Sequence, residues 1–224
     1  MTDDELAELI QDCPTLYHMA ERGSWPSICQ HGLLSTSALL DLYGVHGPKR
    51  EAMEGQRRPV GVRLDHPALG GIVIRDQQPM DDAGLRKCLL DGLSPEDWYR
   101  LLNCKVFFWL TRARLDRLLN ARPYRNIEHD VLELDTAALV AANRDAIFLS
   151  PINSGATRPF PAPRGLATFL PIAEYPYAHW RSKRPRGERV VELAVDHCVP
   201  EITRFVRRVT TMRSGEESGA KPIS

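Results

Sequence analysis

The sequence predicts an α+β fold, because short helices gather in the first half of the chain and short strands gather in the second half. Capping residues with apolar spacing indicate the helices, and β-branched and aromatic runs indicate the strands. Neither GxGxxG nor GxxxxGK followed by Ser or Thr occurs, so the sequence does not support a Rossmann or a P-loop nucleotide site.

Local signals place the elements of the first half. Ser94-Pro95-Glu96-Asp97 supplies an N-cap, a proline in the first turn and an acidic third residue, which is a strong helix start. Ser24 and Gly32 bound another helix as its N-cap and C-cap, and Ser35 or Thr36 begins the next. Helices are expected over residues 4–11, 25–31, 36–43, 82–91 and 94–103. Strands are expected over residues 15–19, 60–64 and 71–74.

In the second half, the run 105–110 is strongly strand-like, and Thr111 caps a helix that extends to Asn120. Further strands are expected over residues 131–134, 146–149, 189–195 and 204–209, with a helix over 136–142. Residues 44–59 contain three glycines among polar side chains and predict a mobile loop. We expect one domain over residues 1–212, a functional loop over 150–163 and a disordered tail over 213–224.

Composition excludes several classes of protein. The 224 residues carry a formal net charge of zero, which does not fit a protein that packages nucleic acid. Five cysteines without CxxC spacing indicate free thiols in a reducing compartment. An acidic N-terminus and the lack of a long apolar run predict a soluble, cytoplasmic protein without a membrane segment. No metal is expected, because Cys13, His18, Cys29 and His31 lack zinc-ligand spacing.

Three segments carry a resemblance to a known family. The first joins Leu16-Tyr17-His18 to Trp25-Pro-Ser-Ile28 and to His31-Gly-Leu-Leu-Ser35, the second is Val106-Phe-Phe-Trp109, and the third is the strand 190–195 before Val199-Pro200. In order and spacing they resemble the DarT-like ADP-ribosyltransferases, which use NAD to modify nucleobases in DNA. The resemblance covers about a quarter of the chain and implies two small, packed antiparallel or mixed sheets around a cleft.

The resemblance also implies site residues. Glu192 would be the catalytic carboxylate, and Arg50 would lie over the active site, although Arg57 and Arg58 compete for that position. The family usually places a small or hydroxyl residue two positions after its histidine, whereas the run here is Met19-Ala20, which offers no hydroxyl group. From the residues alone, an exposed strand position is the more common role for Glu192, and a partly buried core position the more common role for His18. The residues that would contact NAD are His18, Gly32, Leu33, Ser35, Phe107, Trp109 and Arg112.

The acceptor is expected to be a nucleobase of single-stranded DNA or of RNA, and the resemblance implies an antitoxin or hydrolase as a possible partner. A basic stretch over residues 181–189 could guide a phosphate backbone, and Tyr177 and Trp180 could stack a base. One alternative is a non-catalytic module that binds NAD, ADP-ribose or nucleic acid. Another is an RNA 2′-phosphotransferase-like enzyme, whose arginine-based phosphate site is not evident in the sequence.

Overall fold

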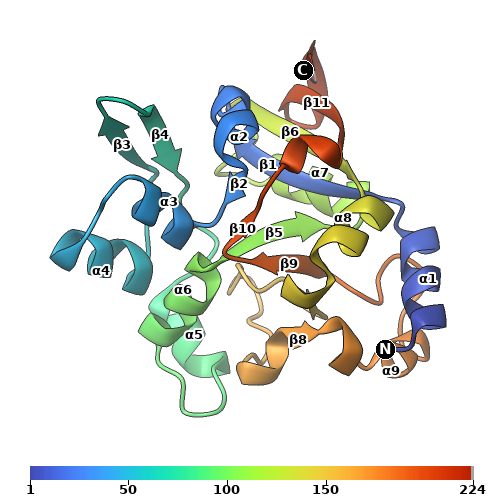
Figure 1. Ribbon diagram of the computed structural model, residues 1–224. Coiled ribbons are helices and arrows are strands. Elements are labelled where there is room, and N and C mark those ends of the chain that lie inside the picture. The colour runs from blue at the N-terminus through green and yellow to red at the C-terminus, as the bar shows by residue number, and fades with distance from the viewer. Residues whose placement is uncertain (223–224) are drawn as a thin grey trace.

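The computed structural model describes residues 1–222 and contains one large antiparallel sheet with helices around it (Figure 1). Its eight strands lie in the order β12-β11-β6-β1-β5-β9-β7-β8. Their bounds, in that order, are Glu216–Lys221, Val206–Arg213, His129–Asp135, Thr15–Glu21, Lys105–Trp109, Glu192–Asp196, Ile147–Ser150 and Leu170–Pro171. The predicted α+β class is confirmed.

Two short antiparallel pairs lie outside the large sheet. They are β2 (Leu33–Leu34) with β10 (Cys198–Val199), and β3 (Val62–His66) with β4 (Gly70–Ile74). The β3–β4 hairpin lies beside α3 and α4, apart from the large sheet in the view of Figure 1. The α-helices are α1 Asp3–Asp12, α2 Trp25–His31, α3 Thr36–Leu42, α4 Gly47–Gly55, α5 Asp82–Cys88, α6 Pro95–Asn103, α7 Arg112–Leu119, α8 Thr136–Asn143 and α9 Tyr177–Arg181. The 3-10 helices are Arg144–Ala146, Leu166–Thr168, Ile172–Glu174 and Ile202–Arg204.

The expectation of two small packed sheets is wrong as stated, because the main strands form one continuous sheet. That sheet is nevertheless almost divided between β1 and β5, where Tyr17 opposite Trp109 is the one registered pair within residues 1–222. Elsewhere the strands pair along their length: β1 and β6 are in register from Thr15 to Glu21. The two halves of the sheet therefore splay apart at this seam.

Alternation along the strands separates a core face from a face that is free to carry polar groups. In β9, Leu193 and Val195 belong to the largest hydrophobic cluster together with Phe108 of β5. Ala194 belongs to a different cluster that also includes Trp98 of α6. Glu192 shares the face of Ala194 and thus points away from the main core.

Two segments expected to lack structure are ordered. In the predicted loop 44–59, α4 forms because Pro48 lies in the first turn and Met53 packs into a small cluster with Leu40. The predicted disordered tail instead continues β11 and adds β12, with Glu217 bonded to Arg208 across the hairpin. Polar cross-strand pairs replace the missing apolar residues. Residues 223 and 224, also part of that prediction, lie outside the described residues.

Across residues 1–222, no helix has the length and apolar character needed to cross a membrane. All five cysteines are free.

Candidate functional site

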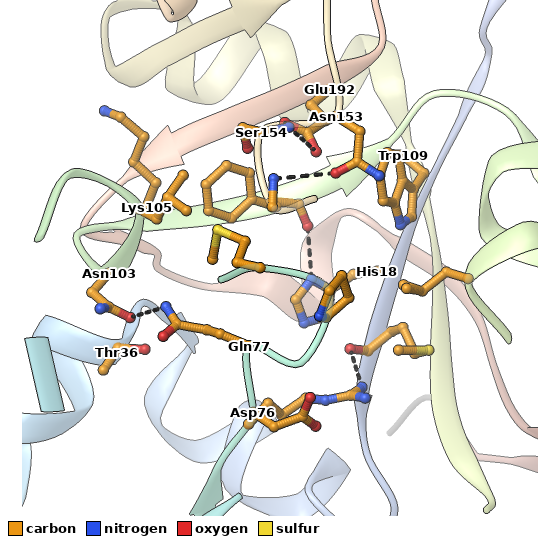
Figure 2. Close-up of a pocket in the computed structure, with 18 of the residues that line it drawn as sticks. His18, Thr36, Asp76, Gln77, Asn103, Lys105, Trp109, Asn153, Ser154 and Glu192 are labelled. Carbon is orange, nitrogen blue, oxygen red and sulfur yellow. Dashed lines mark hydrogen bonds between the residues drawn. The ribbon is translucent and has the colours of Figure 1, made fainter. Parts of the chain in front are cut away.

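Two adjoining cavities open at the seam between β1 and β5, and Figure 2 shows the one that contains Glu192. Their volumes are about 290 and 260 Å³. The first holds Glu192, and the second is lined by α2, β2 and the start of α3. The residues that line both are His18, Met19, Thr36, Arg75, Lys105 and Phe107. A ligand that occupies both cavities would have to cross this shared rim.

Glu192 is the buried acid of the first cavity. It lies opposite Trp109 of β5 and Ser150 of β7, and only 4% of it is exposed. The backbone N–H of Ser154 donates to both carboxylate oxygens, at 3.1 and 3.2 Å. Burial raises the pKa of Glu192 to about 7, against the lowering effect of the Ser154 hydrogen bond. The carboxyl group therefore titrates close to neutral pH.

Arg164 fixes the turn that carries Ser154. Its guanidinium group is 1% exposed and donates to the carbonyl oxygens of Ala162, Ser154 and Ala156, at 3.0, 2.8 and 2.8 Å. The indole of Trp98 also donates to the Ser154 carbonyl, at 3.3 Å. These bonds hold Ser154 by its carbonyl, and its backbone N–H points at Glu192. Sequence reasoning missed Arg164, since nothing local distinguishes it from other arginines of the proline-rich loop.

His18 lies across the first cavity from Glu192 (Figure 2). Its Nδ1 is 2.9 Å from the Phe107 carbonyl oxygen, and because a carbonyl only accepts, Nδ1 must carry the proton. Burial lowers the pKa of His18 to about 4, so the ring is neutral at pH 7. Nε2 is then a hydrogen-bond acceptor, suited to a donor such as a sugar hydroxyl.

Phe107 and Trp109, the two aromatic residues predicted to contact NAD, line the first cavity. They alternate with Phe108, which is buried in the main core, so both lie on the face of Glu192. Phe107 packs against Phe169 with the ring centroids 5.9 Å apart. The aromatic strand thus supplies one wall of the cavity.

Gly32, Leu33 and Ser35 line the second cavity together with His18. Gly32 has a positive φ of 81°, and a Cβ there would lie 2.8 Å from the Val199 carbonyl oxygen. Close packing against β10 and the positive φ therefore explain why a glycine occupies this position. The Ser35 hydroxyl accepts the N–H of Ala38 at 3.1 Å and caps α3.

Arg50 and Arg112, the two predicted arginines, do not line either cavity. Arg50 lies on α4, where it bonds to Glu54 at 3.1 Å and pairs with Asp41. Arg112 bonds to Asp116 of its own helix at 2.8 Å. The prediction that these side chains belong to the site is wrong, because nearby carboxylates hold both of them elsewhere.

Two other arginines line the first cavity instead, Arg58 and Arg75. Arg58, which the sequence left as a competitor of Arg50, is 7% exposed and bonds to the Arg75 carbonyl at 3.1 Å and to Asn103 Oδ1 at 2.8 Å. Arg75 follows β4 directly and was not predicted. The signal that could have found it is a charged residue at the end of the apolar run 72–74.

The basic stretch 181–189 is largely neutralised by α1. Arg181 and Arg189 pair with Glu8, and Arg189 also lies 3.3 Å from Asp12. Tyr177 is 1% exposed, and Arg184 covers Trp180 at 4.1 Å from the ring centroid. Arg181, Arg189 and Tyr177 are therefore engaged within the fold, whereas Lys183 and Arg186 remain exposed.

Within the described part of the chain, no three His, Cys, Asp or Glu residues gather in a way that could hold a metal ion. Comparison with known protein families matches residues 14–206 to a family of unknown function. No curated protein and no solved structure matches the chain.

Proposed function

The match spans most of the chain, which therefore belongs to DUF7002, a family of unknown function, and we propose that it is an NAD-dependent ADP-ribosyltransferase. One observation carries the proposal: Glu192 and His18, some 174 positions apart in the sequence, line the same cavity at a splayed seam of the sheet. The resemblance of these segments to DarT-like enzymes supports the same conclusion, and the ADP-ribosyltransferase fold is part of the proposal.

The proposed chemistry needs an anion beside the sugar. When the bond between nicotinamide nitrogen and ribose C1′ breaks, the electron pair leaves with nicotinamide and the ribose becomes oxocarbenium-like. An ionised Glu192 would stabilise that positive charge. It could then accept the proton that the acceptor nitrogen or oxygen loses as it bonds to C1′.

The other side chains of the cavities have roles that fit this reaction. His18 Nε2 would accept a hydrogen bond from a ribose hydroxyl, since its Nδ1 proton is engaged by Phe107. Phe107 or Trp109 would stack on nicotinamide, because both line the wall beside Glu192. Gly32, Leu33 and Ser35 would surround the other half of NAD in the second cavity.

The acceptor we propose is a nucleobase of single-stranded DNA or of RNA, on the strength of the resemblance. An antitoxin or hydrolase that reverses the modification would be the corresponding partner. A cytoplasmic location is also part of the proposal, supported by the five free cysteines.

Nicotinamide release from NAD tests the proposal, measured with and without single-stranded DNA, RNA and protein acceptors. We expect Glu192→Gln to lower the rate by about 10²- to 10⁴-fold, because the amide can neither offset the positive charge nor take the proton. The wild-type rate should rise as pH increases through about 7, as Glu192 ionises. Glu174→Gln, on an exposed residue, is the matched control. Binding of NAD without release of nicotinamide under any condition would show a non-catalytic module instead.

One observation favours a second candidate, an RNA 2′-phosphotransferase-like enzyme. Arg58 and Arg75 place two guanidinium groups along the first cavity, where a phosphate could be held. An oligonucleotide with a 2′-phosphate, added to the same NAD assay, separates the two activities. Loss of that phosphate would favour this second candidate, and transfer of ADP-ribose to a base would favour the first.

A further inference from the structure

We propose that Arg75 binds the diphosphate of a dinucleotide substrate at the rim shared by the two cavities. The inference deepens the proposed function, on which the identification of the substrate as a dinucleotide rests. It begins from position: Arg75 lines both cavities, whereas Glu192 lines only the first and Gly32 only the second. A ligand whose central group binds Arg75 would therefore place one half in the first cavity and the other half in the second.

The guanidinium group of Arg75 is held in place but keeps N–H groups that can donate to a ligand. Its Nη1 donates to the Met19 carbonyl at 3.0 Å, and its Cζ lies 5.3 Å from the ring centroid of Tyr124. Tyr124 is itself fixed by a 2.8 Å hydrogen bond to Asp76 Oδ1. One edge and one face of the guanidinium group are thereby fixed. The remaining N–H groups make no hydrogen bond to the described residues.

Arg75 also lacks a direct ion pair, although the charges of Asp76 and Glu21, acting from a distance, oppose the lowering of its pKa by burial. No carboxylate of residues 1–222 lies within 4 Å of it, unlike Arg50 and Arg112. A cation that is partly withdrawn from water and has no direct ion pair is costly, so an anionic ligand that contacts it would bind favourably there. Burial lowers the pKa of Arg75, which agrees with this environment.

The other cations of the cavities are already engaged. Lys105 pairs with Asp196 and lies over Phe148 at 4.1 Å. Arg58 donates to Met53, Arg75 and Asn103, so its N–H groups mainly hold the loops together. Arg75 is therefore the cation best placed to meet a diphosphate, which a planar guanidinium group can bind through two parallel hydrogen bonds.

Equilibrium binding of ADP-ribose, ADP, inorganic pyrophosphate and adenosine to the full chain tests the inference. We expect Arg75→Met to weaken the three diphosphates by about 10- to 100-fold, as for loss of a charged hydrogen bond, and to leave adenosine unchanged. Arg75→Lys should retain part of the affinity. Arg112→Met, which removes a paired arginine outside the cavities, is the control.

The inference fails if the wild-type chain does not bind a diphosphate, or if Arg75→Met weakens adenosine as much as ADP-ribose. Thermal unfolding of each variant identifies one that does not fold, and Arg75→Lys or Arg75→Gln then provides the comparison. The outcome is separable from that of the proposed function. Diphosphate binding through Arg75 without nicotinamide release would overturn only the enzymatic proposal. Nicotinamide release with an unchanged KM for NAD in Arg75→Met would overturn only the inference.

Discussion

Charged side chains have different partners in two regions of the molecule. Where the segment 181–189 meets α1, Arg181 and Arg189 face the carboxylates of Glu8 and Asp12. Around the cavities, Glu192, Arg75 and Arg164 have neutral partners instead: a backbone N–H for the acid and backbone carbonyls for the arginines. A cluster of arginines in the sequence therefore does not identify a binding surface. A charge that the fold leaves without its opposite is the better guide.

The difference has an energetic meaning. Ion pairs at a partly exposed interface satisfy both charges within the fold, and each pair contributes modestly to stability. A buried charge with neutral partners keeps a desolvation cost that a complementary ligand can offset. The charged side chains around the cavities differ, however, because some use all their hydrogen-bonding groups within the fold and others leave some of them free. Four substitutions separate these cases.

The largest loss of stability is expected for Arg164→Met. The change removes the donors of three carbonyl oxygens around the Ser154 turn, and unsatisfied buried acceptors are costly. We expect the free energy of unfolding at pH 7 to fall by about 3 kcal/mol in urea titrations. Arg158→Met, on an exposed arginine of the same loop, should have little effect. Equal losses in the two variants would show that the Arg164 hydrogen bonds do not stabilise the turn.

The next effect is the pH dependence of stability caused by Glu192. The carboxyl group keeps its proton in the folded protein up to about pH 7, whereas in the unfolded chain it ionises near its ordinary pKa of 4.5. Its stabilising contribution is therefore complete below the unfolded value and is lost as pH rises through the folded value. Glu192→Gln removes this loss, so the variant should gain about 2 kcal/mol over the wild type between about pH 5 and about pH 8.

Urea unfolding of both proteins at each pH measures this gain. His18 acts in the opposite sense, because its lowered pKa makes its contribution disappear as pH falls toward about 4. That contribution is common to both proteins and cancels in their difference. If the free energies of unfolding of wild type and Glu192→Gln change in parallel with pH, the pKa of Glu192 is not raised in the folded protein.

The sequence predicted the strands of His18 and Glu192, because capping residues and alternation are local signals that act within a few residues. The resemblance also selected Phe107 and Trp109 for the site, and the strand register puts both on the face of Glu192. Which arginine reaches the cavities depends on which carboxylates lie nearby in space. Arg50 is held away from them by Asp41 of α3, nine residues earlier in the chain. The tail was missed for a similar reason: Lys221 pairs with Asp130 of β6, which the sequence places far away.

The smallest changes in stability are expected when one arginine from each region is replaced by methionine. Arg189→Met breaks ion pairs with Glu8 and Asp12 and a 3.0 Å hydrogen bond to Tyr177, so stability should fall by about 1.5 kcal/mol. Arg75→Met removes a half-buried cation whose one side-chain hydrogen bond goes to a carbonyl, and without ligand the change should stay within about 0.5 kcal/mol. Thermal and urea unfolding of the two variants give both values. ADP at about ten times its wild-type Kd should then stabilise Arg189→Met as it stabilises the wild type and have much less effect on Arg75→Met, since ligand that binds the folded state shifts unfolding by mass action. A larger loss in Arg75→Met than in Arg189→Met would mean that the fold itself, rather than a ligand, satisfies the charge at the seam.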